Sequence, residues 1–208
     1  MALMPASGSA RRLTGAAAFG ALAFLVSGIG GENRLVRADR AAFETVRARR
    51  SRAGIVVARA VSSLAEPEVV YPLLALAGVA AAPRIGWRRA CAPCLVVASG
   101  AFARRRLSRL ISRPRPPSEA WLTVPEGFSL PSKHTTLAAL AVGAGVRTLG
   151  PPGAAGRACP LLTAAAVGTS RVYLGVHWPA DVVAGWLFAE GWLRLIDPGI
   201  EPGGHEAT

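Results

Sequence analysis

The stretch SRVYLGVHWPAD, residues 170–181, joins the last two apolar segments of this chain. It overlaps the end of the apolar segment 159–172 and leads into the segment 178–196. Because long apolar runs between breakers predict helices, two helices are expected to meet here. The turn between them carries an arginine, a histidine and an aspartate, three side chains that can take part in acid–base chemistry or phosphate binding.

Four further apolar segments lie upstream, at residues 13–29, 69–82, 90–103 and 135–149. Glycines and prolines separate them, and most of the five tryptophans fall near segment ends, as membrane-interface anchors do. The pattern predicts an all-α protein, a six-helix transmembrane bundle in one domain over residues 1–198. Residues 199–208 are predicted to form a disordered tail.

The composition is unusually apolar for a chain of this length. Hydrophobic residues make up 51% of the 208 residues, and charged residues only 17%. A soluble domain this small has too little interior for so much apolar surface, so we expect an integral, multi-pass protein of the plasma membrane.

A cleaved signal peptide is the alternative for the first segment, which follows Arg11 and Arg12. A retained helix is favoured because the apolar run is longer than the usual signal core.

The chain carries a net charge of +12. Such an excess ordinarily indicates nucleic acid, anionic lipid or a phosphorylated substrate, because each supplies the missing counter-charge. Residues 32–64 combine arginines with apolar residues in a spacing that permits a basic amphipathic segment on a lipid surface. An ordinary solvated helix in a loop fits the same pattern.

His177 and Asp181 are the first candidate catalytic pair. If a helix begins near Trp178, the Asp181 carboxylate can reach one imidazole nitrogen and select the tautomer. The other nitrogen is then free to act as a nucleophile. Arg171 offers a planar guanidinium suited to phosphate oxygens. A simple helix-capping pair is the non-catalytic interpretation.

A second cluster, PSKH, occupies residues 131–134 just before an apolar segment. Ser132 is a suitable N-cap, and the free amides of a helix start form an anion site. His134 beside such a site is placed to give a proton to a departing oxygen. A capping turn with an incidental histidine is again the alternative.

A third cluster, RRRLSRLISRPRP, occupies residues 104–116. Arg106 and Arg113 are seven residues apart, about two helical turns, so both can face one side at the membrane boundary. Arg115 forms a second Arg-Pro pair. Arginines that stop membrane transfer would look similar, although they would not need the RPRP ending.

In order and spacing, the three clusters resemble the active-site signature of the type 2 phosphatidic acid phosphatase superfamily, which includes vanadium-dependent haloperoxidases. The family pattern is Lys, six residues, Arg-Pro; then Pro-Ser-Gly-His; then Ser-Arg, five residues, His, three residues, Asp. The last part is matched in full by Ser170, Arg171, His177 and Asp181. The resemblance covers residues from about 102 to 186 and implies a six-helix core.

The resemblance implies a phosphatase that needs neither a metal nor another cofactor. His177 would be the nucleophile that forms a phosphohistidine, with Asp181 orienting it and His134 protonating the leaving group. Arg171 would hold the phosphoryl oxygens. The remaining candidate phosphate ligands are Arg106, Arg113, Arg115, Ser132 and Lys133.

Two positions depart from the family pattern. Lys133 stands where the family has glycine and adds a cation beside the phosphate site. The lysine of the first motif is missing: counting back seven residues from Arg113 reaches Arg106, and counting back from Arg115 reaches Ser108. The register of this motif therefore stays open.

An active site on an apolar helical scaffold indicates a lipid-linked phosphate or diphosphate, such as a polyprenyl carrier or a phosphatidate-like lipid. No nucleic-acid partner is expected, and the oligomeric state is not predicted. Most of the 24 basic residues would lie on the side of the membrane that carries the three clusters, but several of them are candidate phosphate ligands. The positive-inside rule therefore does not decide on which side of the membrane the active site lies. A catalytically impaired family member that binds lipid phosphate as a scaffold or transporter is the alternative.

Overall fold

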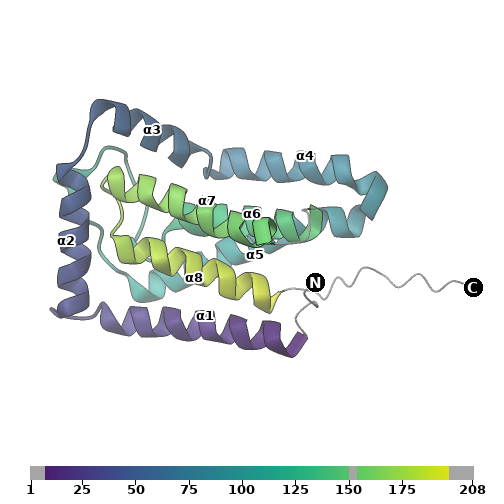
Figure 1. Ribbon diagram of the computed structural model, residues 1–208, viewed down its shortest axis with the longest axis horizontal. Coiled ribbons are helices and arrows are strands. Elements are labelled where there is room, and N and C mark those ends of the chain that lie inside the picture. The colour runs from purple at the N-terminus through teal and green to yellow at the C-terminus, as the bar shows by residue number, and fades with distance from the viewer. Residues whose placement is uncertain (1–7, 150–153, 197–208) are drawn as a thin grey trace, which may run out of the picture.

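The computed structural model describes residues 8–149 and 154–196, which form eight α-helices and one short 3-10 helix (Figure 1). The helices are α1 (Gly8–Gly28), α2 (Arg34–Ala48), α3 (Arg52–Ser63), α4 (Pro67–Ile85), α5 (Trp87–Ile111), α6 (Lys133–Leu149), α7 (Ala154–Tyr173) and α8 (Pro179–Leu195), with η1 (Ser118–Ala120) between α5 and α6. The all-α prediction is confirmed. The six apolar segments correspond to α1 and α4–α8, while α2 and α3 occupy the basic segment 32–64. The predicted tail lies outside the described residues.

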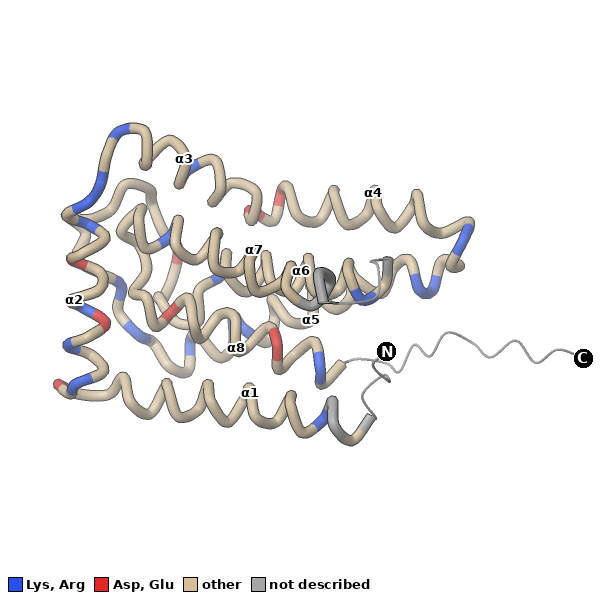
Figure 2. Tube along the Cα trace, viewed as in Figure 1, with Lys and Arg blue, Asp and Glu red and all other residues tan. Residues whose placement is uncertain are grey.

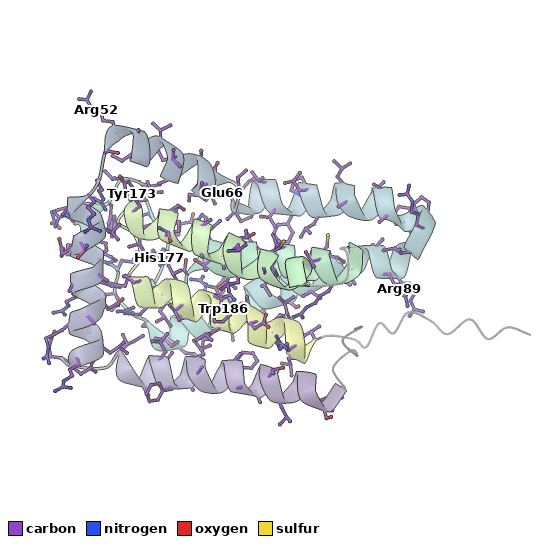
Figure 3. The ribbon with its side chains drawn as sticks, viewed as in Figure 1. Arg52, Glu66, Arg89, Tyr173, His177 and Trp186 are labelled. Atoms are coloured by element: carbon purple, nitrogen blue, oxygen red, sulfur yellow. The ribbon has the colours of Figure 1, made fainter. Side chains whose placement is uncertain are left out.

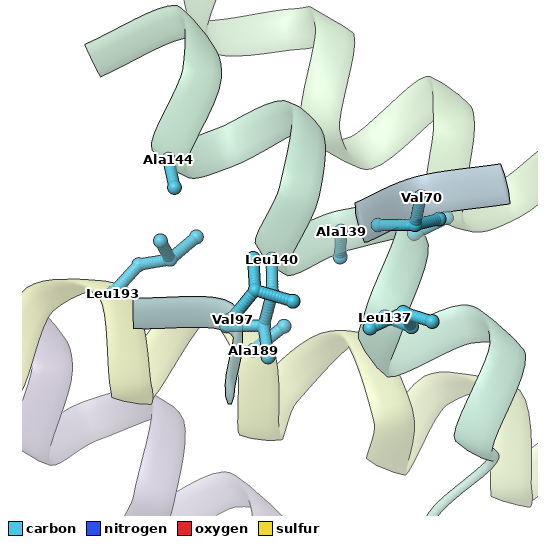
Figure 4. Close-up of a cluster of buried hydrophobic side chains, with 9 residues drawn as sticks. Val70, Val97, Leu137, Ala139, Leu140, Ala144, Ala189 and Leu193 are labelled. Carbon is cyan, nitrogen blue, oxygen red and sulfur yellow. The ribbon is translucent and has the colours of Figure 1, made fainter. Parts of the chain in front are cut away.

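Helices α5 to α8 form the centre of the bundle, with α1 packed on α8, α4 on α5 and α6, and α3 on α7. Val97 of α5, Leu140 of α6 and Ala189 of α8 are fully buried where these helices meet (Figure 4). Small residues allow this close approach: a Cβ on Gly100 of α5 would press on Leu140 and on the Trp192 ring. The core therefore fixes the spacing between α5, α6 and α8.

Helix α2 does not run along the bundle but crosses one end of it (Figure 1). Asn33 caps its first turn, accepting a hydrogen bond from the Val36 amide at 3.0 Å. Val36 and Phe43 are buried, and Phe43 packs against Ala120 and Trp178. The apolar face of α2 thus covers the turn that precedes α8, and the arginines of α2 are exposed. The amphipathic pattern of this segment therefore serves packing within the protein as well as any contact with lipid.

The middle parts of α1 and α4 carry no charged residues, and many of the arginines lie at the end of the bundle that α2 crosses (Figure 2). Among the described helices, α4 alone is long and apolar enough to cross a membrane by length and composition; residues Arg12–Gly28 form a shorter apolar helix. Large apolar side chains are exposed around the bundle, including Phe24, Leu76, Leu95, Phe102 and Leu162. Such a belt of exposed apolar side chains is typical of a protein surrounded by lipid.

Candidate active site

The three sequence clusters meet at the end of the bundle that α2 covers. They surround a pocket of about 110 Å3. Its lining residues are Glu66, Arg115, Thr123, Val124, Pro125, Glu126, Lys133, His134, Arg171 and His177. The two histidines thus share one small polar cavity with three of the predicted phosphate ligands, Arg115, Lys133 and Arg171.

His177 lies in the turn between α7 and α8, with 1% of its surface exposed (Figure 3). Its Nδ1 is 3.4 Å from Asp181 Oδ2, a long contact, and the same oxygen accepts a hydrogen bond from the Trp178 amide at 2.8 Å. Asp181 sits in the first turn of α8, where the helix dipole also favours a carboxylate. Because a carboxylate can only accept a hydrogen bond, this contact favours the tautomer with the proton on Nδ1 and leaves the lone pair of His177 Nε2 free.

The turn itself depends on Gly175, whose φ is +82°. A Cβ at this position would clash with the carbonyl oxygen of Ala120. Glycine therefore satisfies both the left-handed backbone and the close approach of the 3-10 segment.

Asp181 also belongs to a buried ion-pair network with Arg113 and Asp39. Arg113 Nη1 donates to Asp181 Oδ1 and Arg113 Nη2 donates to Asp39 Oδ2 of α2, each at 2.6 Å. Asp39 Oδ1 also accepts a hydrogen bond from the Ala180 amide at 2.8 Å. All three charged side chains are buried, so Arg113 neutralises two carboxylates and fixes the start of α8.

Arg115 is the arginine of the third cluster that contacts His177. Its Nη1 donates to His177 Nε2 at 3.2 Å, and its guanidinium also donates to backbone carbonyl oxygens of Glu126, Gly127 and Phe128. Arg115-Pro116 therefore takes the place of the Arg-Pro pair in the first motif. In that register the position of the missing lysine is Ser108, which is buried in α5.

His134 lies in the first turn of α6, buried, with its Nε2 2.7 Å from Glu66 Oε1. No described residue is a partner for its other ring nitrogen, Nδ1, although that atom is also buried. Since His134 lines the same pocket as His177, the two imidazoles flank a space in which one phosphoryl group can meet both. This is the arrangement required of a nucleophile and a general acid.

The other predicted phosphate ligands occupy different places. Arg171 is buried at the pocket and donates through Nη1 to Ser62 Oγ at 2.7 Å, while its Nε has no partner among the described residues. Lys133 lies at the pocket rim between two carboxylates, 3.7 Å from Glu126 and 4.0 Å from Glu66.

Three other candidates lie apart from the lining. Arg106 is exposed and stacks over the Phe102 ring at 5.9 Å. Arg113 is committed to the two carboxylates described above. Ser132 is buried, and its Oγ accepts a hydrogen bond from the Thr135 hydroxyl at 3.0 Å. The structure therefore does not bring these three side chains to the pocket surface.

Three residues of the site were not anticipated. Asp39 had a recognisable signal, because its spacing from Val36 and Phe43 puts it on the buried face of α2. Arg104 is buried one turn before Ser108 and donates through Nε to the Pro131 carbonyl oxygen at 2.7 Å, but it sits among many arginines. Glu66 has no sequence signal, since only the fold brings the start of α4 to His134.

Burial lowers the pKa of His177 to about 4, with Arg115 and Arg171 acting in the same direction and Asp181 opposing them. The native imidazole is therefore neutral at pH 7, as a nucleophile requires.

The lowered pKa of His177 predicts how stability depends on pH. Between pH 6.5, the ordinary pKa of histidine, and about pH 4, the unfolded chain binds a proton that the native protein does not, so stability falls as the pH is lowered through this window. We expect the Tm in detergent to drop more steeply from pH 6.5 to pH 4 for the wild type than for His177→Asn. Equal slopes would contradict the lowered pKa.

Comparison with known proteins agrees with the geometry. Residues 89–197 match the family described as the PAP2 superfamily. A decaprenylphosphoryl-5-phosphoribose phosphatase of Mycobacterium tuberculosis (strain ATCC 25618 / H37Rv) is 35% identical over 141 residues, which cover 63% of this chain and 72% of the relative. An undecaprenyl-diphosphatase of Sulfolobus acidocaldarius is 48% identical over 44 residues, 21% of each chain.

A solved structure is similar over nearly the whole chain. It is the transmembrane PAP2-type phosphatidylglycerolphosphate phosphatase from Bacillus subtilis, with a TM-score of 0.78 and 25% identity. The match covers 90% of this chain and 97% of the other. The bundle described above is thus the fold of a membrane protein.

Proposed function

This chain belongs to the PAP2 superfamily, and on that premise we propose that it hydrolyses a phosphate or diphosphate carried by a membrane lipid through a phosphohistidine formed on His177. The observation that carries the proposal is the pocket itself. A buried imidazole oriented by Asp181, a second buried imidazole and the guanidinium groups of Arg115 and Arg171 surround one cavity.

In the first step, His177 Nε2 attacks phosphorus and forms a P–N bond while the bond to the leaving oxygen breaks. The bonding electrons go to that oxygen, which takes a proton from His134. Arg115 and Arg171 neutralise the equatorial phosphoryl oxygens, which is the main task in phosphoryl transfer. In the second step, water attacks phosphorus, His134 accepts the proton of that water, and the P–N bond breaks to release phosphate and restore His177.

Polyprenyl-linked substrates are the first class to test. The relatives named above act on decaprenylphosphoryl and undecaprenyl compounds. Exposed apolar side chains on α4 and α5 would contact a long hydrocarbon chain, while the pocket receives only the phosphate. We further propose a multi-pass location in the plasma membrane, where such lipids would reach the site laterally.

The decisive experiment measures phosphate release by the purified protein in detergent, with a chelator present. The panel contains a polyprenyl diphosphate, a polyprenyl monophosphate, a polyprenylphosphoryl phosphopentose, phosphatidylglycerolphosphate and phosphatidate. We expect one lipid class to be hydrolysed with the chelator present, and His177→Ala to remove that activity. No release from any lipid, combined with retained binding, would instead favour the impaired family member, for which Ser108 in place of lysine is the relevant observation.

A further inference from the structure

Glu66 is a partly exposed carboxylate at the pocket, and it lies outside the part of the chain matched by the family. It stands at the junction of α3 and α4, and its Oε1 accepts a hydrogen bond from His134 Nε2 at 2.7 Å (Figure 3). Although Glu66 is the N-cap residue of α4, its side chain makes no capping hydrogen bond to that helix. The carboxylate is therefore directed to the histidine and not to the helix that it begins.

The surroundings of His134 oppose a charged imidazolium. The ring lies in the first turn of α6, where the helix dipole is positive, and it is buried. Lys133 precedes it, and Arg171 and Arg115 share its pocket, as does the imidazole of His177. Two carboxylates at the pocket oppose the effect of these groups. Glu66 is in hydrogen-bond contact with His134, and Glu126 lies at the rim, 87% exposed and 3.7 Å from Lys133.

Glu66 is itself kept ionised by this setting. Burial would raise the pKa of its carboxyl group, but the hydrogen bond from His134 and the positive charges of Lys133 and Arg171 help to bring that pKa below its usual value. An ionised carboxylate is thus available beside the ring at neutral pH. It selects the tautomer with a proton on Nε2 and leaves Nδ1 as the ring nitrogen for a substrate oxygen.

Resting on the phosphatase function proposed above, we infer that Glu66 is the positioning residue of the general acid: it orients His134 and stabilises its imidazolium so that Nδ1 protonates the leaving oxygen. The site then contains two carboxylate–imidazole pairs with different tasks. Asp181 orients the nucleophile, and Glu66 supports the acid. The second pair is assembled from α3–α4 and α6, so it exists only in the folded protein.

The test compares Glu66→Gln with Glu68→Gln on two substrates. Glu68 is two residues away on α4 and exposed, and it makes the matched control. One substrate is a long-chain alkyl phosphate, whose leaving oxygen must be protonated; the other is an alkyl-substituted nitrophenyl phosphate, whose leaving group departs as an anion. We expect Glu66→Gln to lower kcat/KM for the alkyl ester by about 10- to 100-fold, and for the nitrophenyl ester by less than about 3-fold.

A pH profile gives the second readout. Loss of the Glu66 charge destabilises the imidazolium, so the alkaline fall of kcat/KM for the alkyl ester should move to lower pH in Glu66→Gln and stay in place in Glu68→Gln. Equal losses on both esters, or no loss on either, would overturn the inference, because a structural role does not distinguish leaving groups. If the wild type hydrolyses neither ester nor any lipid of the panel, the phosphatase function itself fails, which is a separate result.

Discussion

His177→Ala should lower phosphate release by at least about 1,000-fold, because removal of an attacking group abolishes the covalent route. The imidazole is 1% exposed and is the group at the pocket that Asp181 orients. Asp181 keeps its partner Arg113 in the variant, so the start of α8 should remain in place. The measurement is initial phosphate release in detergent, with substrate labelled in the transferred phosphoryl group.

The same labelled substrate should leave an acid-labile, alkali-stable phosphoprotein in the wild type after rapid quenching, and none in His177→Ala. His134→Ala is the informative comparison: with the nitrophenyl ester it should still form the phosphoprotein, since the nitrophenolate leaves without a proton. The phosphoprotein should also persist longer, because the base that accepts the proton of the attacking water is gone. A labelled His177→Ala protein, or hydrolysis within a few-fold of the wild type, would show that the nucleophile lies elsewhere.

Arg113→Met should cause the largest loss of stability, about 3 to 5 kcal/mol, because it leaves two buried carboxylates without their shared cation. For a chain of this size the corresponding fall in Tm is roughly 6 to 20 °C. Arg109→Met is the matched control: Arg109 is exposed in the last turn of α5, four residues before Arg113, and its removal should change the Tm little. Thermal unfolding in detergent measures both variants.

A double variant tests the cause of the loss. Asp39→Asn removes one of the two carboxylates while its side-chain oxygen can still accept from the Ala180 amide. Asp39→Asn combined with Arg113→Met should therefore be less destabilised than the sum of the single variants, because one unpaired charge has been removed. Additive losses would mean that Arg113 acts by packing against Trp178 and not by its charge.

The arginine cluster of residues 104–116 shows that local sequence does not predict which arginine reaches the pocket. Arg106, Arg113 and Arg115 are equivalent by residue type, and spacing permits two registers. In the structure, Arg106 stacks on Phe102 at the surface and Arg113 is buried between two carboxylates. Arg115 contacts His177. The difference arises because the chain leaves α5 between Arg109 and Arg113, and the direction of that loop is decided by contacts with α2 and α8.

What the sequence by itself determined is the apolar, all-helical fold and the local pair of His177 and Asp181. Both follow from short-range rules. Apolar runs between breakers predict helices, and a helix that begins near Trp178 puts Asp181 in its first turn, within reach of the preceding His177. Only the tertiary structure decided that Glu66 meets His134, that Asp39 shares Arg113 with Asp181 and that Arg115 belongs to the first motif. These contacts join residues 62 to 74 positions apart, and such distances are set by how the helices pack, which no local spacing encodes.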